Sequence, residues 1–339
     1  MDNHLKIDWA EAWRVHHAGR KTPGDSDYWN GRAKQFSTHA GMSPYARKFI
    51  AKLGLKGGET IFDMGAGGGT LAIPLAQMGH TVVAADFSSG MLNTLAAAAD
   101  ALELTTISTL RLSWEDDWFN GSFLIDPTGK LPKGPLREKQ FDVAIASRST
   151  IVADLEDAFA KLTRIAKRKV AVTMATEFSP KRFDALKVAI GQHPNEHDDF
   201  IYGLGLLLQQ GKYPTLSYID SRKTDAFVSR AAAIDYYTQL VGEMTPEQTA
   251  RLAAYLDEHL IFEASTESPE KSSADVRFMP WVHPEVSVEN PEQGPNNSDH
   301  DRAGDNKHTH EQDHTHERYM LDTQRLVRWA FITWNPGID

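Results

Sequence analysis

The chain has 339 residues, with 36 basic against 46 acidic side chains and a formal net charge of −10. This balance argues against a nucleic-acid binder that works through a broad basic surface. Cysteine is absent, which excludes disulfides, thiolate zinc sites, iron–sulfur clusters and every mechanism that needs a cysteine nucleophile.

The N-terminal segment, residues 1–45, is predicted to form a helical lid. Trp9 and Trp13 lie near helical spacing, and Asp27 is a candidate cap for a second helix. No apolar signal region is found at the start, and no uncharged apolar run approaches the roughly 20 residues of a membrane helix. We therefore expect a soluble, cytoplasmic protein with no membrane partner.

The next segment, residues 46–266, is predicted to be the main domain. Apolar runs of strand length alternate with helical patterns, which predicts a doubly wound, mostly parallel α/β sheet covered on both faces. A stretch rich in proline and glycine, 120–140, predicts a surface loop. The predicted strands are 59–65, 80–87, 106–114, 141–148, 169–176 and 215–221, and the predicted helices are 70–78, 90–102, 154–166, 180–190, 198–210, 224–241 and 246–262.

Residues 267–318 differ sharply in composition from the rest of the chain. They hold twelve acidic and five basic residues, six of the 14 histidines and, from about residue 285, almost no apolar side chains. Such a segment cannot offset its ordering entropy, so a largely disordered insertion is predicted, followed by a C-terminal strand in 319–339.

A short repeat in this insertion pairs histidines with carboxylates. Paired imidazoles can bind nickel, zinc or cobalt, although without preset geometry they select weakly. The alternative is a solvated low-complexity loop. The candidate metal ligands are His308, His310, His314 and His316.

The glycine-rich stretch IFDMGAGGGT, residues 61–70, predicts a nucleotide site where a strand turns into a helix. No Gly-Lys-Ser/Thr follows, which excludes a P-loop. A dinucleotide site remains open, because Gly67, Gly69 and Ala72 fit its alanine variant. Asp63 favours another ligand, since a carboxylate at the strand tip would repel a pyrophosphate but suits the amine of S-adenosylmethionine. Asp86, at the end of the next strand, would bind ribose in either case.

With FDMGAGGG, ADFSSGML, SWEDDW and FDVAIASRS, the sequence resembles the class I (Rossmann-like) S-adenosylmethionine-dependent methyltransferases, in particular their small-molecule subgroup. The resemblance implies a seven-stranded sheet with an antiparallel last strand. It also implies that Asp63 orders the loop and meets the methionine amine, that Asp86 binds the ribose, and that Phe87 packs on the adenine. The family often has aspartate at the position of Trp114, so hydrogen bonding to adenine could shift to Glu115 or Asp116. The full set of expected donor-binding residues is Asp63, Gly65, Ala66, Gly67, Asp86, Phe87, Trp114, Glu115 and Ser147.

The methyl acceptor is expected to be a small molecule. The run Ser147-Arg148-Ser149-Thr150 replaces the Asn/Asp-Pro-Pro-aromatic motif of enzymes that methylate amino groups of nucleic acid. Arg148 could meet an anionic acceptor or pair with Asp154. Candidate catalytic residues are Arg148, His39 and Glu177, and further pocket candidates are Tyr28, Trp29 and Arg32.

Three other functions stay open at this point. One is a metal-binding or regulatory protein that binds S-adenosylmethionine without turnover. The others are a methyltransferase that acts on RNA or protein and an NAD-dependent oxidoreductase. The oligomeric state is not predicted.

Overall fold

The computed structural model describes residues 7–18, 26–33, 42–120, 134–179, 183–193, 198–265, 276–278, 316–322 and 324–337. The chain divides into two compact units. The first comprises Met1–Asp184, Pro194–Ser221 and Leu326–Asp339, and the second comprises Ala185–His193 and Arg222–Arg325.

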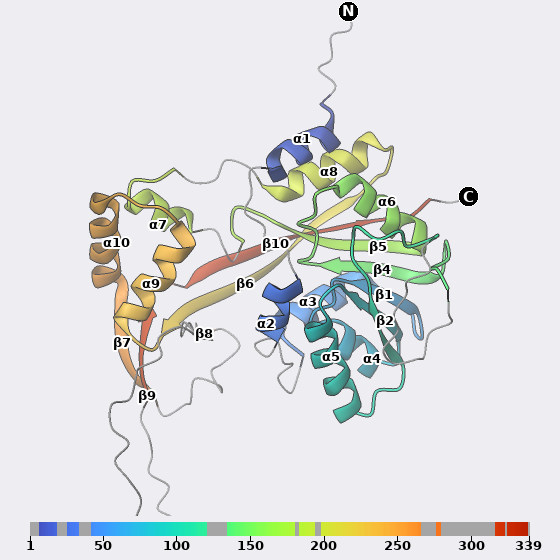
Figure 1. Cartoon of the computed structure of the whole chain (residues 1–339), viewed down its shortest axis with the longest axis horizontal. Coiled ribbons are helices and arrows are strands. Elements are labelled where there is room, and N and C mark those ends of the chain that lie inside the picture. The colour runs from blue at the N-terminus through green and yellow to red at the C-terminus, as the bar shows by residue number, and fades with distance from the viewer. Residues whose placement is uncertain are drawn as a thin grey trace, which may run out of the picture. The chain divides into compact units, whose positions relative to one another are not determined.

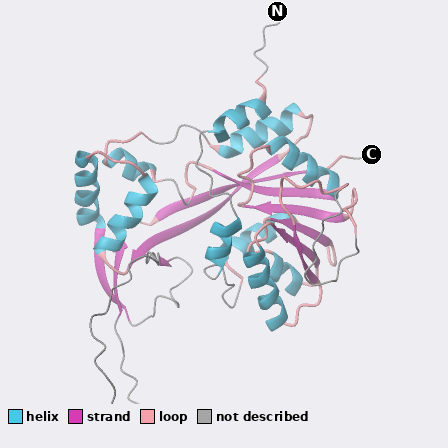
Figure 2. Ribbon diagram, in the orientation of Figure 1, coloured by secondary structure: helices cyan, strands magenta, loops and turns pink. Residues whose placement is uncertain are grey.

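The first unit is built on a sheet with the strand order β3-β2-β1-β4-β5-β10-β6 (Figures 1 and 2). Strands β1 to β5 are parallel to one another, whereas β10 runs antiparallel to β5. The bounds are β1 Thr60–Met64, β2 Thr81–Asp86, β3 Ile107–Arg111, β4 Phe141–Ser147, β5 Ala166–Ala175, β6 Thr215–Phe227 and β10 Arg325–Trp334.

Helices cover both faces of this sheet (Figure 1). Neighbouring strand residues point to opposite sides, so Phe62 packs in the cluster formed with α1, α6 and α8, and Ile61 packs with α3, α4 and α5. Near-continuous apolar strands follow from this double coverage, as expected for parallel strands buried on both faces. The bounds are α1 Trp9–Ala18, α3 Pro44–Leu53, α4 Ala72–Gln77, α5 Ser89–Ala101, α6 Leu155–Ile165 and α8 Asp199–Gln209.

The N-terminal helix α1 is held against α8 by close packing. A Cβ built on Gly205 would lie 2.3 Å from ring atoms of Trp9, so only glycine permits this approach. Trp13 is fully buried, and its indole N–H donates to the carbonyl of Val152 at 2.8 Å. This contact brings α1 to the loop that follows β4.

The second unit combines short strands with helices. The last part of β6 pairs parallel with β8 (Val276–Phe278) and antiparallel with β9 (His316–Leu321), and β9 pairs antiparallel with β7 (Leu260–Ser265). The helices are α7 (Asp184–Ala189, which starts at the last residue of the first unit's segment), α9 (Arg230–Val241) and α10 (Pro246–His259).

The parallel α/β class predicted from the sequence is confirmed, but the strand number is wrong. The sheet has ten strands, nine in one hydrogen-bonded path with β8 beside it, and not seven. The additional strands β7, β8 and β9 come from residues 260–321, where composition predicted a helix end and a disordered insertion. Residues 266–275 and 279–315 of this region lie outside the described residues.

One predicted helix, 224–241, is wrong at its start. Residues 224–227 complete β6, and α9 begins only at Arg230 after the N-cap Ser229. Asp225 falls in the predicted helix, but in the structure it belongs to β6, is 1% exposed, and its carboxylate accepts hydrogen bonds from Tyr237 and Arg325. Arg325 lies one hundred residues away in the sequence, so no local pattern indicates this contact.

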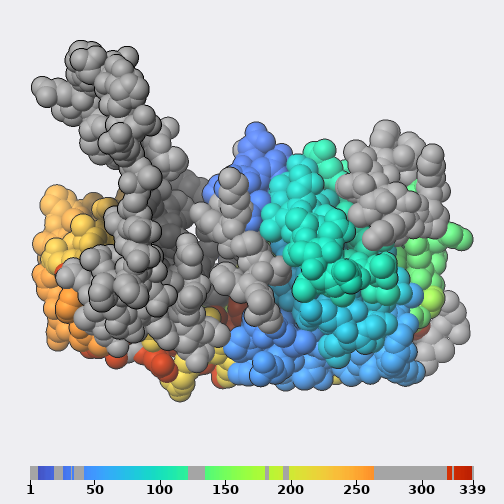
Figure 3. Space-filling model, turned by 90° about the horizontal axis from the view of Figure 1, so that it is seen from below, coloured from blue at the N-terminus to red at the C-terminus, as the bar shows by residue number. Residues whose placement is uncertain are grey.

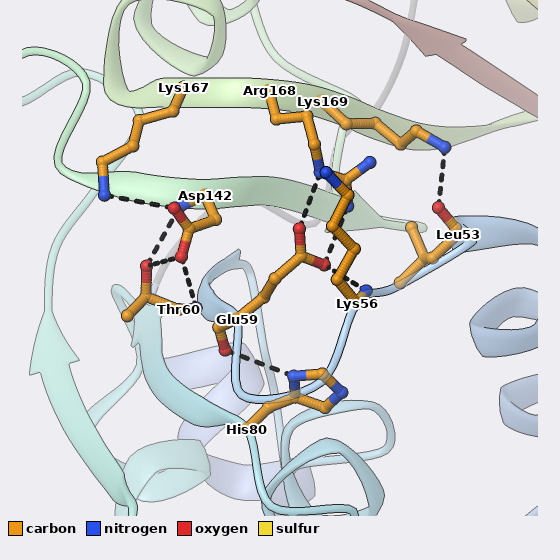
Figure 4. A network of polar contacts seen from close by, with 9 residues as sticks. All are labelled: Leu53, Lys56, Glu59, Thr60, His80, Asp142, Lys167, Arg168 and Lys169. Atoms are coloured by element: carbon orange, nitrogen blue, oxygen red, sulfur yellow. Dashed lines mark hydrogen bonds and ion pairs between the residues drawn. The ribbon is translucent and has the colours of Figure 1, made fainter.

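A network of hydrogen bonds and ion pairs links the residues at the edge of the sheet where β1, β4 and β5 begin (Figure 4). Arg168 donates two hydrogen bonds, at 2.6 and 2.8 Å, to the Glu59 carboxylate. Asp142 accepts from the backbone and side chain of Thr60 and from Lys167. Because the strands are parallel, all their carboxyl ends lie at the opposite edge.

Within the described part of the chain, no helix has both the length and the apolar character needed to cross a lipid bilayer.

Candidate functional site

The glycine loop lies at the carboxyl edge of the sheet, directly after β1. Gly65 and Gly67 adopt φ of 73° and 54°, in the left-handed region that favours glycine. The N–H groups of Gly65 and Ala66 both donate to the carbonyl of Ala85 in β2, at 2.8 and 3.0 Å. These bonds fix the loop across the ends of two neighbouring strands.

Ser149, from the loop after β4, locks the same turn from the other side. Its hydroxyl donates to the carbonyl of Met64 at 2.8 Å. A Cβ built on Gly65 would lie 2.3 Å from the Ser149 Cβ, closer than any real contact. Gly65 is therefore required by both its backbone conformation and its neighbour.

Asp86 ends β2 and binds the glycine loop to the start of α5. One carboxylate oxygen accepts the N–H of Gly67 and the other accepts the N–H of Ser88, both at 2.9 Å. Burial raises the pKa of Asp86, and backbone hydrogen bonds from Ser88, Gly67 and Phe87 oppose that rise. Within the described part of the chain, the donors to this carboxylate are backbone N–H groups, through which it supports the loop.

Asp63 lies in β1, one residue before its end, and is 2% exposed. Among the described residues, none donates a hydrogen bond to its carboxylate. Burial, together with the nearby charge of Asp86, raises the pKa of Asp63 to about 7. A buried carboxylate without a cationic partner is costly, and a ligand ammonium would relieve that cost.

The loop after β3 contributes aromatic side chains. Trp114 is partly buried, and its indole N–H donates to the carbonyl of Ser149 at 3.0 Å. The structure therefore brings Trp114 beside the loop that holds Gly65. Glu115 is exposed; its carboxylate accepts from the Ser113 hydroxyl, and with Lys161 and Arg164 it lines a surface groove. Phe87, after Asp86, is partly buried.

A second polar cluster joins the ends of β4 and β5 to α3. The Tyr45 hydroxyl forms hydrogen bonds with Ser147 Oγ at 2.7 Å and with Thr173 Oγ1 at 2.9 Å. Thr173 Oγ1 also accepts the N–H of Arg148 at 3.0 Å. Thr173 has no exposed surface, so this cluster is anchored in the core.

The short helix α2 (Ser26–Arg32) packs on α5 and forms a continuous surface with it (Figure 3). The side-chain oxygen of Asn30 accepts from the N–H of Gly90 and from the hydroxyl of Ser88, both at 2.8 Å. Ser88 in turn caps α5 by accepting the N–H of Met91. Asn30 is thereby linked to Asp86 through a single residue, Ser88.

The remaining predicted residues are distributed less compactly. Tyr28 and Trp29 contact each other edge to face on α2, and Glu177 is exposed after β5. His39 and the side chain of Arg32 lie outside the described residues. The predicted Arg148–Asp154 pair is not found in the described part of the chain; Asp154 instead caps α6 by accepting the N–H of Asp157.

The predicted metal ligands His308, His310 and His314 also lie outside the described residues, and so does the side chain of His316. Within the part of the chain that the structure describes, no group of three or more His, Asp or Glu side chains could hold a metal ion. Metal binding by the insertion stays a prediction from sequence. It fails if equilibrium dialysis finds no saturable binding that disappears when the four histidines are changed to Ala.

Sequence reasoning missed Tyr45, Thr173 and Asn30. None of them lies in a motif, because each reaches the site through a contact between distant segments. Ser149 stands within the quoted run FDVAIASRS, but nothing in that run indicates its contact with Gly65.

Comparison with known proteins gives a consistent result. The family model described as a methyltransferase domain matches residues 62–174. An uncharacterized protein of Haemophilus influenzae is 31% identical over 221 residues, which are 63% of this chain and 74% of that protein. A protein of Geobacillus sp. (strain WCH70) with a provisional methyltransferase name is 31% identical over 78 residues, 23% of this chain and 32% of that protein.

Among solved structures, an S-adenosylmethionine-dependent methyltransferase from Aquifex aeolicus matches with a TM-score of 0.41 at 18% identity. The match covers 55% of this chain and 89% of that one.

The chain belongs to the class I methyltransferases that use S-adenosylmethionine, and it shares a family with the Haemophilus protein. It is an enzyme of that class. The residues present fit the donor: Asp63 is a buried carboxyl group to which no described residue donates a hydrogen bond, and an ammonium would stabilise its charged form. A Cβ built on Gly67 would meet no atom within 4 Å, so there is space beside the glycine loop.

Proposed function

We propose that the enzyme methylates a small-molecule acceptor by direct in-line displacement. The observation that carries this proposal is the carboxyl edge of the sheet, where short hydrogen bonds tie the glycine loop to Ala85 and Asp86 and the buried Asp63 lies at the end of β1. Ligands of open α/β sheets bind at this edge. The complete absence of cysteine and the Ser-Arg-Ser-Thr run after β4 favour a small acceptor over nucleic acid.

In this proposal each residue of the edge has a defined role toward the donor. Asp63 binds the methionine ammonium, and Gly65, Ala66, Gly67 and Ser147 surround the methionine end. Asp86 accepts the ribose hydroxyls. The adenine-binding set is Phe87, Trp114 and Glu115.

The donor supplies a methyl group on a positively charged sulfur. A lone pair of the acceptor forms the new bond to the methyl carbon as the S–CH₃ bond breaks, and the bonding pair stays on sulfur to give S-adenosylhomocysteine. Alignment and exclusion of water supply most of the acceleration in such a transfer. The chain therefore needs to position two molecules more than it needs a strong base.

Titration calorimetry with S-adenosylhomocysteine and with NAD tests the donor. We expect the wild-type protein to bind S-adenosylhomocysteine and Asp86→Ala to bind it at least about tenfold more weakly, since ribose hydrogen bonds to a charged group are lost. Asp100→Ala is the matched control, because Asp100 is an exposed aspartate of α5. Tight binding of NAD instead would overturn the proposal.

Release of S-adenosylhomocysteine in the presence of pooled metabolites tests the transfer. Turnover with the small-molecule pool is the expected outcome. Turnover only with RNA or protein fractions would contradict the small acceptor, and donor binding without turnover on any pool would indicate a sensor.

A further inference from the structure

Arg148 is the first residue after β4, and its side chain is exposed at the carboxyl edge of the sheet. Its backbone adopts a φ of 57°, in the left-handed region that non-glycine residues rarely occupy. Its guanidinium carbon lies 4.3 Å from the centre of the Tyr45 ring. The Arg148 side chain thus lies against the Tyr45 ring, one residue beyond the end of β4.

The surrounding contacts explain why this backbone conformation persists. The N–H of Arg148 donates to the buried Thr173, and the next residue, Ser149, is bound to the end of β1. Unfavourable backbone conformations are kept only where neighbouring structure over-determines them, and such positions cluster at functional sites.

Tyr45 supports the guanidinium without neutralising it. Its hydroxyl is fixed by Ser147 and Thr173, so the ring cannot rotate away. Burial raises the pKa of Tyr45, which keeps the phenol neutral. The cation lies over the face of the ring, a contact that uses none of the guanidinium N–H groups in a hydrogen bond.

Within the described part of the chain, the positive charge of Arg148 forms no ion pair. Arg168 and Arg328 each form a two-bond pair with a carboxylate, Glu59 and Asp220 respectively. No carboxylate of the described residues pairs with Arg148. A guanidinium that is stacked on an aromatic ring and forms no ion pair is suited to bidentate hydrogen bonding with a carboxylate ligand.

We propose that Arg148, supported by Tyr45, forms a carboxylate-binding site next to Asp63. Strands β1 and β4 are neighbours, with Asp63 in register with Ile145, so the two charged groups lie at adjacent strand ends. The inference rests on the proposed function and names the ligand chemistry of the same edge. Two sources can supply the carboxylate: the amino-acid end of the donor, whose ammonium would meet Asp63, or an acidic acceptor.

Calorimetry tests whether the amino-acid end of the donor supplies the carboxylate. S-Adenosylhomocysteine carries the carboxylate, whereas 5′-methylthioadenosine has the same adenosine and thioether without the amino-acid end. If Arg148 binds the carboxylate of the donor, Arg148→Gln lowers the affinity for S-adenosylhomocysteine at least about tenfold and leaves the affinity for methylthioadenosine unchanged. Arg148→Lys keeps the charge but loses the two-bond geometry and recovers only part of the affinity.

Turnover measurements test whether an acidic acceptor supplies the carboxylate. Pooled metabolites are divided on an anion-exchange column, and release of S-adenosylhomocysteine is measured with the retained and unretained fractions. If Arg148 binds an acidic acceptor, the retained fraction supports turnover by the wild type. Arg148→Gln then lowers that turnover at least about tenfold, while its affinity for the donor is unchanged.

Control variants keep both arms interpretable. Arg47→Gln removes an exposed arginine of α3 and should change neither measurement. Tyr45→Phe keeps the ring beneath the guanidinium, whereas Tyr45→Leu removes it and should reproduce part of the loss of affinity or turnover seen in Arg148→Gln. Thermal melting shows whether each variant is folded. The proposal is overturned if folded Arg148→Gln matches the wild type in both arms. Failure of the wild type to bind S-adenosylhomocysteine would instead overturn the proposed function.

Discussion

The side-chain oxygen of Asn30 accepts the backbone N–H of Gly90 at 2.8 Å, and this contact ties α2 to the first turn of α5. The same oxygen accepts the Ser88 hydroxyl. Two hydrogen bonds of about 1 kcal/mol each would be lost in Asn30→Ala. We expect faster amide hydrogen exchange across residues 26–33 and donor binding weakened by about three- to tenfold.

Asn93→Ala is the control for this variant, since Asn93 is an exposed residue of the same helix α5. Gly90→Ala should act like Asn30→Ala, because its Cβ would lie 3.0 Å from the Asn30 Cα. Unchanged exchange across α2 in both variants would show that the contact does not hold the helix.

Gly65→Ala should abolish donor binding, because the new Cβ overlaps Ser149. The double variant Gly65→Ala/Ser149→Gly removes the overlapping atoms and should recover part of the affinity. The left-handed conformation would still cost roughly 1–2 kcal/mol for alanine. Calorimetry with S-adenosylhomocysteine measures both variants, and a double variant no better than the single one would contradict the overlap as the cause.

Donor affinity should fall as the pH drops below about 7. The pKa of Asp63 is raised to about 7 in the free protein, and an ammonium beside it would lower that value. Binding then requires loss of a proton at lower pH, so affinity decreases by up to about tenfold per pH unit. Calorimetry between pH 5 and 8 checks the slope, which should be absent in Asp63→Asn if that variant binds at all.

The same raised pKa predicts an effect on stability without donor. The protonated carboxyl is favoured in the fold, so its contribution is complete below the usual pKa of aspartate and is lost as the pH rises through about 7. Asp63→Asn cannot ionise. Its melting temperature should therefore exceed that of the wild type more at pH 8 than at pH 5, as thermal melting would show.

Glu59→Gln should destabilise the protein by about 2 kcal/mol at pH 7, since it breaks a largely buried two-bond pair with Arg168. Burial alone would raise the pKa of Glu59, but hydrogen bonds from Arg168 and from the N–H of Lys56 hold it below its usual range. The stabilisation is therefore present above the usual pKa of glutamate and is lost as the pH falls below it.

Urea unfolding at pH 7 and at pH 4 or lower measures this difference, which should shrink in acid. Glu247→Gln is the control, because Glu247 forms an exposed pair with Arg251 within one helix. Such exposed pairs contribute a few tenths of a kcal/mol. Equal effects of the two substitutions would contradict the role assigned to burial.

Much of the first unit could be predicted from the sequence because its signals are local. The run from Thr60 to Asp86 contains strand, turn and helix patterns in unbroken order, and each carboxylate directly ends or precedes a turn. The positions of Asp63 and Asp86 near the ends of β1 and β2 could be predicted from such spacing, and the structure links the loop between them to Asp86. Their roles toward the donor stay a prediction.

The contacts that complete the site could not be predicted this way. Tyr45 meets Thr173 across 128 residues, and Asn30 meets Ser88 across 58. The same limit applies to the end of β6, which the sequence pattern predicts as helix, because Asp225 pairs with Arg325, one hundred residues later. Periodicity reports which face of an element is buried, but not which partner buries it.

The position of β10 affects how the protein is made. In the sheet it lies between β5 and β6, yet in the chain it follows both by about one hundred residues or more. During synthesis both strands leave the ribosome with that edge unpaired, and exposed strand edges invite association between chains. A nascent chain stalled before residue 325 should therefore bind chaperones that full-length chains release, because the last strand to emerge is the one that joins the sheet.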